Sequence, residues 1–252
     1  MLCEFDYRPA AGLLKDKVIL VTGAGSGIGR AAAKAYANQG ASVILLGRTI
    51  SKLEAVYDEI LELGGAEPAI YPLNLEGATW PNYQTMADNI YETFGRLDGV
   101  LHNASILGTI SPVQSYNPEL WQRVMYINFN AQVMLQQATL SLLEQAEDAS
   151  VIFTSSSVGR VGRAFWGPYA CSKFATEGFV QVLSQELENI SNIRVNSLNP
   201  GATRTQMRAD AFPAEHPDTL RKPEEIMGTY LYLMGPDSKG ITGQQFNAQP
   251  DR

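Results

Sequence analysis

Short apolar runs alternate with longer amphipathic segments along most of the chain. The runs are rich in β-branched residues and mostly lack strict apolar–polar alternation, which is typical of strands buried on both faces of a parallel sheet. We expect seven strands, at Lys17–Val21, Ser42–Leu46, Ala69–Leu73, Gly99–His102, Ser150–Thr154, Ile193–Leu198 and Gln244–Ala248. We expect helices at Arg30–Asn38, Ile50–Leu63, Tyr83–Phe94, Pro118–Glu144, Pro168–Asn189 and Pro223–Met234. This order predicts an α/β fold with a doubly wound, seven-stranded parallel sheet and helices on both faces.

The expected elements follow one another without a Pro/Ser-rich linker or a change in composition. We therefore expect one domain over residues 1–252. The least regular stretch is 203–222, which shows little periodicity. A segment of that length without regular structure is often a lid or binding loop, so we expect it to border a substrate site.

Composition narrows the function classes. With 19 Lys and Arg against 26 Asp and Glu, the net charge is −7, and the chain has no basic run. Nucleic acid and anionic membranes are therefore not expected partners. Two cysteines, two histidines and no Cys-x-x-Cys pair predict neither a disulfide framework nor a metal site. No apolar run reaches spanning length, and Glu4 and Asp6 interrupt any signal-like segment, so we expect a cytoplasmic protein.

A glycine cluster at residues 22–29, with the sequence TGAGSGIG, stands between the first expected strand and the first expected helix. Glycines let the chain turn sharply and approach a pyrophosphate, while the helix N-terminus offers free N–H groups. A glycine triplet alone is a weak signal, but its place in a βαβ unit makes it strong. The cluster predicts a dinucleotide site, and the alternative is a glycine-rich turn without a ligand.

The end of the second strand bears on which dinucleotide is bound. Chains that bind NAD usually carry an acid about 20 residues past the glycines, where it binds the ribose 2′-hydroxyl. Here Gly47 and Arg48 follow the strand, and the next carboxylate is Glu54. A permanent guanidinium suits a 2′-phosphate. We therefore expect NADP(H) to be favoured over NAD(H), although Arg48 alone also fits a solvated strand end.

Tyr169 and Lys173 stand four residues apart in an expected helix and therefore share one of its faces. A cation one turn away stabilises a phenolate, so we expect it to lower the tyrosine pKa from its ordinary value of about 10. Such a pair can exchange a proton with a carbonyl or alcohol oxygen. Serines at 155–157 end the preceding strand, where ligands bind in open α/β sheets; alone, they fit an ordinary strand cap.

Together these motifs resemble the classical short-chain dehydrogenase/reductase family over nearly the whole chain. The glycine cluster has the family spacing Thr-Gly-x3-Gly-x-Gly, and Ser156 stands 13 residues before Tyr169, as the family's catalytic serine does. Further matches are Asn103-Ala104, Asn128 and Asn199-Pro200-Gly201 with Thr205. Shorter matches at 155–160, 199–205 and 248–250 resemble the YciK-type bacterial oxidoreductases.

The resemblance implies a single-domain Rossmann fold and an NADP(H)-dependent oxidoreductase that interconverts a carbonyl and an alcohol. Tyr169 would be the general acid–base, Lys173 would lower its pKa and hold the nicotinamide ribose, and Ser156 would orient the substrate oxygen. Asn128 would hold a water that links Lys173 to solvent. A homodimer or homotetramer is also expected. The implied cofactor site comprises Gly23, Gly25, Ser26, Gly27, Ile28, Gly29, Arg48, Asn74, Leu75, Asn103, Ala104, Tyr169, Lys173, Pro200, Gly201, Thr203 and Thr205.

Other polar residues have two interpretations each. His102 replaces an asparagine of the family motif, and we expect a hydrogen-bonded histidine at a strand end rather than a proton carrier. Cys171 points off the catalytic face, so we expect a core thiol rather than a nucleophile. Four arginines near the expected active-site loops either bind an anionic substrate group or form ion pairs. They are Arg160, Arg163, Arg204 and Arg208.

Two functions besides a small-molecule carbonyl reductase stay open at this point. One is a 3-oxoacyl carrier-protein reductase, whose acidic carrier would need a local basic patch such as Arg204 and Arg208. The other is an NADP(H)-binding regulatory protein without turnover. The second has no need of a tyrosine beside Lys173, which argues against it.

Overall fold

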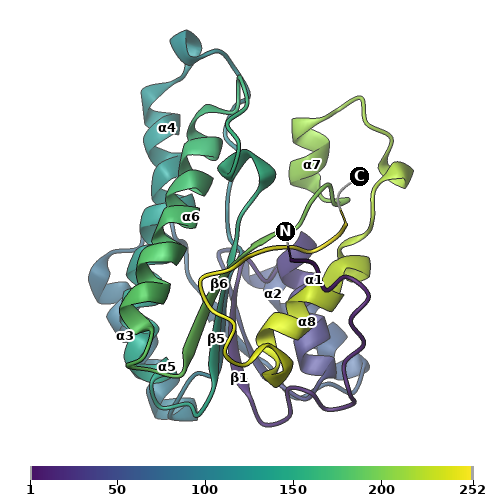
Figure 1. The fold of residues 1–252 in the computed structure, drawn as a ribbon, viewed down its shortest axis with the longest axis vertical. Coiled ribbons are helices and arrows are strands. Elements are labelled where there is room, and N and C mark those ends of the chain that lie inside the picture. The colour runs from purple at the N-terminus through teal and green to yellow at the C-terminus, as the bar shows by residue number, and fades with distance from the viewer. Residues whose placement is uncertain (1, 251–252) are drawn as a thin grey trace.

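A sheet of seven parallel strands forms the centre of the molecule, which the computed structural model describes over residues 2–250 (Figure 1). Its strand order is β3-β2-β1-β4-β5-β6-β7. The strands are β1 (Val18–Thr22), β2 (Ser42–Gly47), β3 (Ala69–Pro72), β4 (Gly99–His102), β5 (Ala149–Thr154), β6 (Ile193–Asn199) and β7 (Gln245–Asn247). The α-helices are α1 (Gly27–Asn38), α2 (Ile50–Glu62), α3 (Trp80–Phe94), α4 (Pro118–Met125), α5 (Ala131–Leu143), α6 (Gly167–Leu187), α7 (Gln206–Ala211) and α8 (Met227–Met234). The predicted fold class is confirmed.

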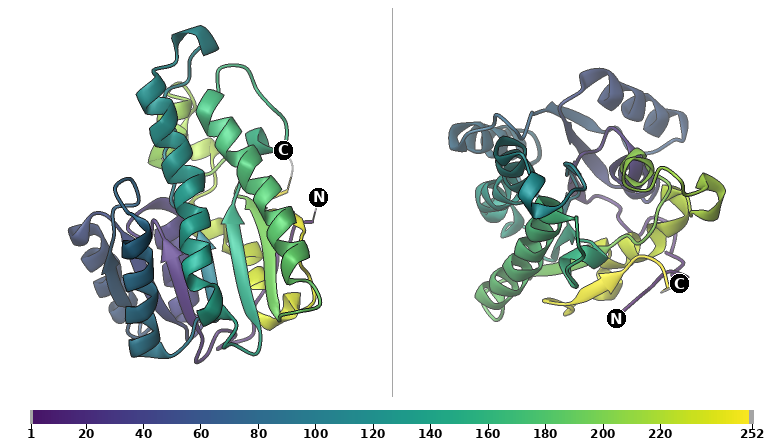
Figure 2. Two further views of the ribbon diagram at one scale, coloured as in Figure 1. Left: turned by 90° about the vertical axis from the view of Figure 1, so that its left-hand side faces the viewer. Right: turned by 90° about the horizontal axis from the view of Figure 1, so that it is seen from above.

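Helices cover both faces of the sheet (Figure 2) because successive strand side chains point to opposite sides. Ile19 and Val21 of β1 join a core with α1, α2 and α8. Val18 and Leu20 join a second core with α3, α5 and α6. Burial on both faces explains why the strands lack polar alternation. Among residues 2–250, no helix combines the length and the apolar character needed to cross a membrane.

The chain reverses its winding direction at β1, which lies between β2 and β4. A crevice forms outside the carboxyl ends of the strands at such a switch point, and ligands of open α/β sheets bind there. The glycine cluster follows β1, Arg48 follows β2, Asn103 follows β4 and the serines follow β5. The fold therefore brings most of the predicted motifs to one edge of the sheet.

The helix expected over Pro118–Glu144 contains a π-helical segment, Tyr126–Asn130, which separates α4 from α5. Such segments are rare and occur frequently at functional sites. Asn128 lies in this segment and is fully buried. The apolar pattern runs on through the segment, so periodicity gave no sign of the change in winding.

The stretch at 203–222 is more regular than expected. It contains α7 and a 3-10 turn at Pro217–Thr219. Thr205 caps α7, because its Oγ1 accepts a hydrogen bond from the N–H of Arg208 at 3.2 Å. Helix α7 stands apart from the sheet, across from the upper ends of α4 and α6 (Figure 1). Its six residues are too few for a helical period to show in the sequence.

Candidate active site

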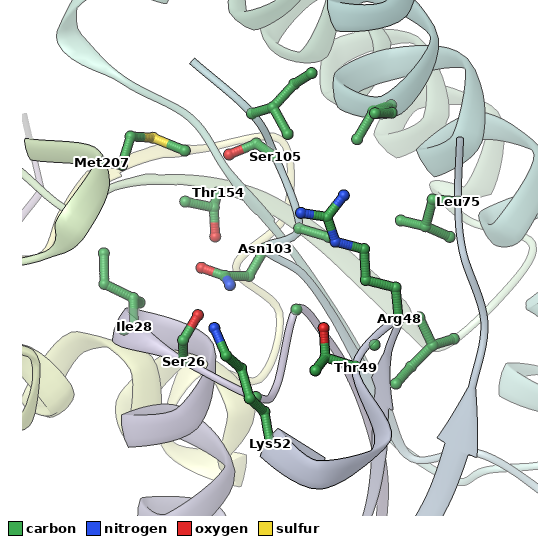
Figure 3. Close-up of a pocket in the computed structure, with 18 of the residues that line it drawn as sticks. Ser26, Ile28, Arg48, Thr49, Lys52, Leu75, Asn103, Ser105, Thr154 and Met207 are labelled. Atoms are coloured by element: carbon green, nitrogen blue, oxygen red, sulfur yellow. The ribbon is translucent and has the colours of Figure 1, made fainter. Parts of the chain in front are cut away.

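A cleft of about 390 Å³ opens where the carboxyl ends of β1, β2, β4 and β5 meet. Figure 3 shows side chains from the loops after these strands, and from α7, turned toward its centre. Most of the predicted cofactor residues line it: Gly23, Gly25, Ser26, Gly27, Ile28, Arg48, Asn74, Leu75, Asn103, Ala104, Tyr169, Pro200 and Thr205. Gly29, Lys173, Gly201 and Thr203 do not line it.

The glycine cluster forms a tight turn between β1 and α1. Gly23 has φ +69°, a conformation that side chains disfavour. A Cβ at Gly29 would lie 2.3 Å from the Gly23 carbonyl oxygen, so only glycine allows this turn. Asn103 braces the turn from β4, because its Nδ2 donates to the Thr22 carbonyl at 3.3 Å. The turn leaves the N-terminus of α1 at the cleft, where free N–H groups and open space fit a pyrophosphate.

Two cations extend into the cleft beside this turn: Arg48 after β2 and Lys52 in the first turn of α2 (Figure 3). Both side chains are exposed, and within residues 2–250 neither forms an ion pair. Sequence reasoning missed Lys52. The available signal was its spacing, since a residue four positions after Arg48 at the start of a helix can reach the same ligand.

Tyr169 lines the cleft with 8 % of its surface exposed. Burial raises the pKa of Tyr169 to about 12, and a side-chain hydrogen bond with Ser156 acts in the lowering direction. Ser156 also caps a 3-10 turn, since its Oγ accepts from the N–H of Val158 at 3.4 Å. The structure therefore brings the predicted tyrosine and serine together, as the spacing of 13 residues implied.

Lys173 lies one helical turn beyond Tyr169 and is fully buried. Its Nζ donates to the Thr154 carbonyl at 2.7 Å and lies 5.7 Å from the centre of the Tyr169 ring. Burial lowers the pKa of Lys173 to about 8, and the nearby Glu177 carboxylate acts against this shift. The Tyr169 pKa is thus raised rather than lowered as expected, because burial outweighs the other effects at the phenol.

Asn128 uses its side-chain amide to hold the loop after β4. Its Oδ1 accepts from the N–H of Ile106 at 2.8 Å, and its Nδ2 donates to the Ile106 carbonyl at 2.9 Å. The same Nδ2 lies 3.2 Å from Ser172 Oγ on α6. The side chain therefore joins the π segment, the loop and the helix that carries Tyr169.

An apolar wall stands beside Tyr169. Leu107, Trp166 and Met207 pack against the buried cluster that contains this tyrosine. The Trp166 ring lies 5.9 Å from the Tyr169 ring and 5.7 Å from the Phe212 ring, so it connects the tyrosine to the segment after α7. Any substrate that reaches Tyr169 from this side meets apolar and aromatic surface.

Three of the four arginines near the active-site loops form ion pairs. Arg160 pairs with Glu177 at 2.8 Å, Arg204 with Asp218 at 2.9 Å and Arg208 with Glu215 at 2.6 Å. Arg163 is exposed. These contacts favour the ion-pair interpretation over an anion-binding site for three of the four arginines.

Two smaller expectations have different outcomes. Cys171 is exposed, so the predicted core thiol is wrong: the face of α6 opposite Tyr169 points away from the core at this end. His102 is hydrogen-bonded at the end of β4 as expected, with Nε2 3.0 Å from Gln136 Oε1, and its buried ring stacks on Phe153. Burial lowers the pKa of His102 to about 4, which keeps it neutral at neutral pH.

Comparison with known proteins places this site in a family. A model of the short chain dehydrogenase family matches residues 17–216. The chain belongs to the short-chain dehydrogenases. It is 53 % identical to the uncharacterized oxidoreductase YciK of Escherichia coli (strain K12), covering 98 % of this chain and 97 % of that one. It is 31 % identical to the cyclohexanol dehydrogenase of Acinetobacter sp. (strain SE19), covering 92 % of each.

Solved structures give the same result. A short chain dehydrogenase of Shigella flexneri 2a, crystallised in complex with NADP, is 54 % identical and superposes with a TM-score of 0.93. The match covers 96 % of this chain and 100 % of that chain. The chain is thus an oxidoreductase of the class that interconverts CH–OH and C=O groups, and its family binds a nicotinamide cofactor.

Proposed function

We propose that the chain is an NADP(H)-dependent oxidoreductase that interconverts a small carbonyl compound and its alcohol, with Tyr169 as general acid–base. One observation carries the proposal. The cleft lined by the glycine turn and by two exposed cations is also lined by Tyr169, a buried tyrosine whose side chain hydrogen-bonds with Ser156. A dinucleotide site and a proton donor therefore share one cavity, as hydride transfer to a carbonyl requires.

The residues present fit NADP(H). The turn at Gly23 and Gly29 would hold the pyrophosphate, and Arg48 would hold the 2′-phosphate, with Lys52 as a second cation. Asn74 lines the cleft where its carbonyl oxygen would accept a hydrogen bond from the adenine amino group. When bound, the cofactor supplies or accepts the hydride. The NADP complex of the Shigella flexneri relative supports this choice of cofactor.

Tyr169 would handle the proton at its hydroxyl oxygen. With a pKa of about 12 the phenol holds its proton at neutral pH, so it is ready to donate to a carbonyl oxygen in reduction. Ser156 would donate a hydrogen bond to the same oxygen. Lys173 would stabilise the phenolate that remains. The amide of Asn128 is taken by Ile106 and Ser172, so a water linking Lys173 to solvent would need its main-chain carbonyl.

Residues 203–222 would form the substrate loop of a single domain, and the apolar wall favours a substrate with an apolar body. The carrier-protein alternative loses support, because Arg204 and Arg208 are neutralised by Asp218 and Glu215. The name of the cyclohexanol dehydrogenase relative is consistent with an uncharged substrate.

We further propose that the protein is cytoplasmic and forms a homodimer or homotetramer. Cell fractionation checks the localisation, and light scattering checks the oligomeric state.

The test is a turnover screen of carbonyls and alcohols with NADPH and NADP⁺, repeated with Tyr169→Phe. We expect kcat to fall by about 10²–10⁴-fold because the ring remains and the transferable proton is lost. NADPH affinity should change little. Tyr91→Phe, on an exposed ring, is the matched control. Full turnover in the Tyr169 variant would refute its role, and NADPH binding without turnover of any substrate would support a regulatory binder.

A further inference from the structure

Three consecutive residues of the loop after β5 lie against three successive turns of α6. Tyr169, Lys173 and Glu177 are spaced four residues apart, so they share one face of the helix. Val158 belongs to the buried cluster that contains Tyr169, Gly159 lies against Lys173, and Arg160 pairs with Glu177. Three successive residues of the loop that carries Ser156 thus lie along three successive turns of the helix that carries Tyr169.

Gly159 makes the middle contact. A Cβ at this position would lie 2.5 Å from the Cβ of Lys173 and 2.8 Å from its carbonyl carbon. Only a residue without a side chain allows the loop to come so near to the helix. The approach at Lys173 is therefore fixed by packing, and the next residue along the loop reaches Glu177.

The Arg160–Glu177 pair is buried, with side chains 8 % and 6 % exposed. The Glu177 carboxylate also accepts from Ser197 Oγ at 2.6 Å and from Gln245 Nε2 at 3.0 Å. Arg160 also donates to Asn247 Oδ1 at 2.9 Å. The pair therefore ties the loop to α6, β6 and β7 at once.

Stability is a weak reason for such a pair. Taking two charges out of water costs about as much free energy as their attraction returns. Proteins in which apolar residues of similar volume replace a buried ion pair are often as stable as the original. Its position suggests a different reason, since Arg160 stands four residues after Ser156 and Glu177 stands four residues after Lys173. Each member is linked through its own element to one group of the proposed proton-transfer site.

We propose that Arg160 and Glu177 are positioning residues of the active site: they fix the Ser156 loop on the helix face that carries Tyr169, and their balanced charges control the charge of Lys173. The positioning half of this proposal, that the pair fixes the Ser156 loop on α6 for catalysis, rests on the function proposed above. The electrostatic half, that the pair controls the charge of Lys173, does not depend on any substrate.

The groups around Lys173 come from three elements. Helix α6 contributes Tyr169 and Glu177, and β5 contributes the Thr154 carbonyl. The loop contributes the guanidinium of Arg160, which is paired with Glu177. Glu177 raises the pKa of Lys173 against the effect of burial. Neutralising Glu177 removes a negative charge near Lys173, whereas neutralising Arg160 removes the positive charge that offsets it. The two changes should therefore move the Lys173 pKa in opposite directions.

The experiment is a pH titration of the full-length protein labelled with ¹³Cε-lysine and followed by NMR, with the Lys173 signal assigned from Lys173→Arg. We expect Glu177→Gln to shift its midpoint down and Arg160→Gln to shift it up, each by roughly one pH unit. The double variant should titrate near the wild type. Shifts in the same direction, or none, would overturn the electrostatic half, because a merely structural defect has no reason to give opposite signs.

Arg160→Lys tests positioning. It keeps the charge and loses the planar fork that reaches Glu177 and Asn247 together. We expect an unchanged Lys173 midpoint, unchanged NADPH affinity and a kcat lowered by roughly tenfold. A kcat equal to the wild type would overturn this half. If a glutamine variant fails to fold, Glu177→Asp takes its place: the shorter acid keeps the charge, and a shift as large as one pH unit would contradict the charge argument.

The two proposals fail in different ways. If no substrate is ever turned over, the function proposed above fails, while the opposite titration shifts are still measurable on Lys173. If turnover depends on Tyr169 and the shifts are absent, the function stands and Arg160 and Glu177 are structural only.

Discussion

At the end of β2, Arg48 places a permanent cation in the cleft where NAD-binding chains have an acid. Arg48→Asp reverses this charge. We expect NADPH affinity to fall by roughly 100-fold, because the phosphate would lose a charge-assisted hydrogen bond and meet a carboxylate. NADH affinity should change by less than about threefold, since NADH has no 2′-phosphate. Fluorescence titration with both cofactors measures the ratio.

Two further variants sharpen this comparison. Lys52→Ala should weaken NADPH binding by a smaller factor, since an exposed ammonium contributes less than a planar guanidinium. Lys15→Asp is the matched control, because Lys15 is exposed and precedes β1, at the other end of the strand from the cleft. Equal losses for NADPH and NADH in Arg48→Asp would contradict selection through the phosphate.

At the scale of single residues, the sequence predicted which side chains meet more readily than what their surroundings do to them. Tyr169 and Ser156 were paired because their spacing of 13 residues matches that of the family they resemble. The direction of the Tyr169 pKa was not predicted, because it depends on burial, and Leu107 and Met207, which pack against this cluster, come from other segments. Cys171 was misassigned for the same reason: which outward helix face is covered depends on neighbouring elements.

Among the elements, the π segment between α4 and α5 is anchored to the loop after β4 by the side chain of Asn128. Asn128→Ala removes both hydrogen bonds to the Ile106 backbone, and burial leaves no water to replace them. We expect a loss of about 2–4 kcal/mol in unfolding free energy, measured by urea denaturation. Asn130→Ala, two residues on and exposed, should change it by less than about 0.5 kcal/mol. Equal effects would show that the segment itself, and not the anchor, contributes the stability.

Element type was easier to predict than element detail. All seven strands were predicted because buried parallel strands are continuous apolar runs. Helix α1 begins at Gly27 rather than Arg30, since the glycine turn itself supplies its first residues. The π segment and α7 escaped prediction because one keeps the apolar pattern of the helix around it and the other is shorter than two turns.

At the scale of the whole molecule, a titratable ring buried in the sheet makes the stability of the fold depend on pH. His102 is fully buried on β4, and burial lowers its pKa to about 4 from about 6.5. Between these two values the unfolded chain holds a proton on this ring and the folded chain does not. Stability therefore falls as the pH falls through this window. The difference of about 2.5 units corresponds to a loss of about 3 kcal/mol.

Replacing the ring isolates this contribution. His102→Asn introduces the residue that the family motif has at this position and has no group that titrates in the window. We expect the variant to be less stable than the wild type at pH 7, because the ring packs on Phe153, and to lose about 3 kcal/mol less between pH 7 and pH 4. Urea unfolding at several pH values measures both curves. His216→Asn, at the exposed second histidine, is the control for the substitution itself. If the His102 variant ran parallel to the wild type, the acid sensitivity of the fold would lie in carboxylates whose pKa an ion pair lowers, such as Glu59 beside Arg30, and not in the buried ring.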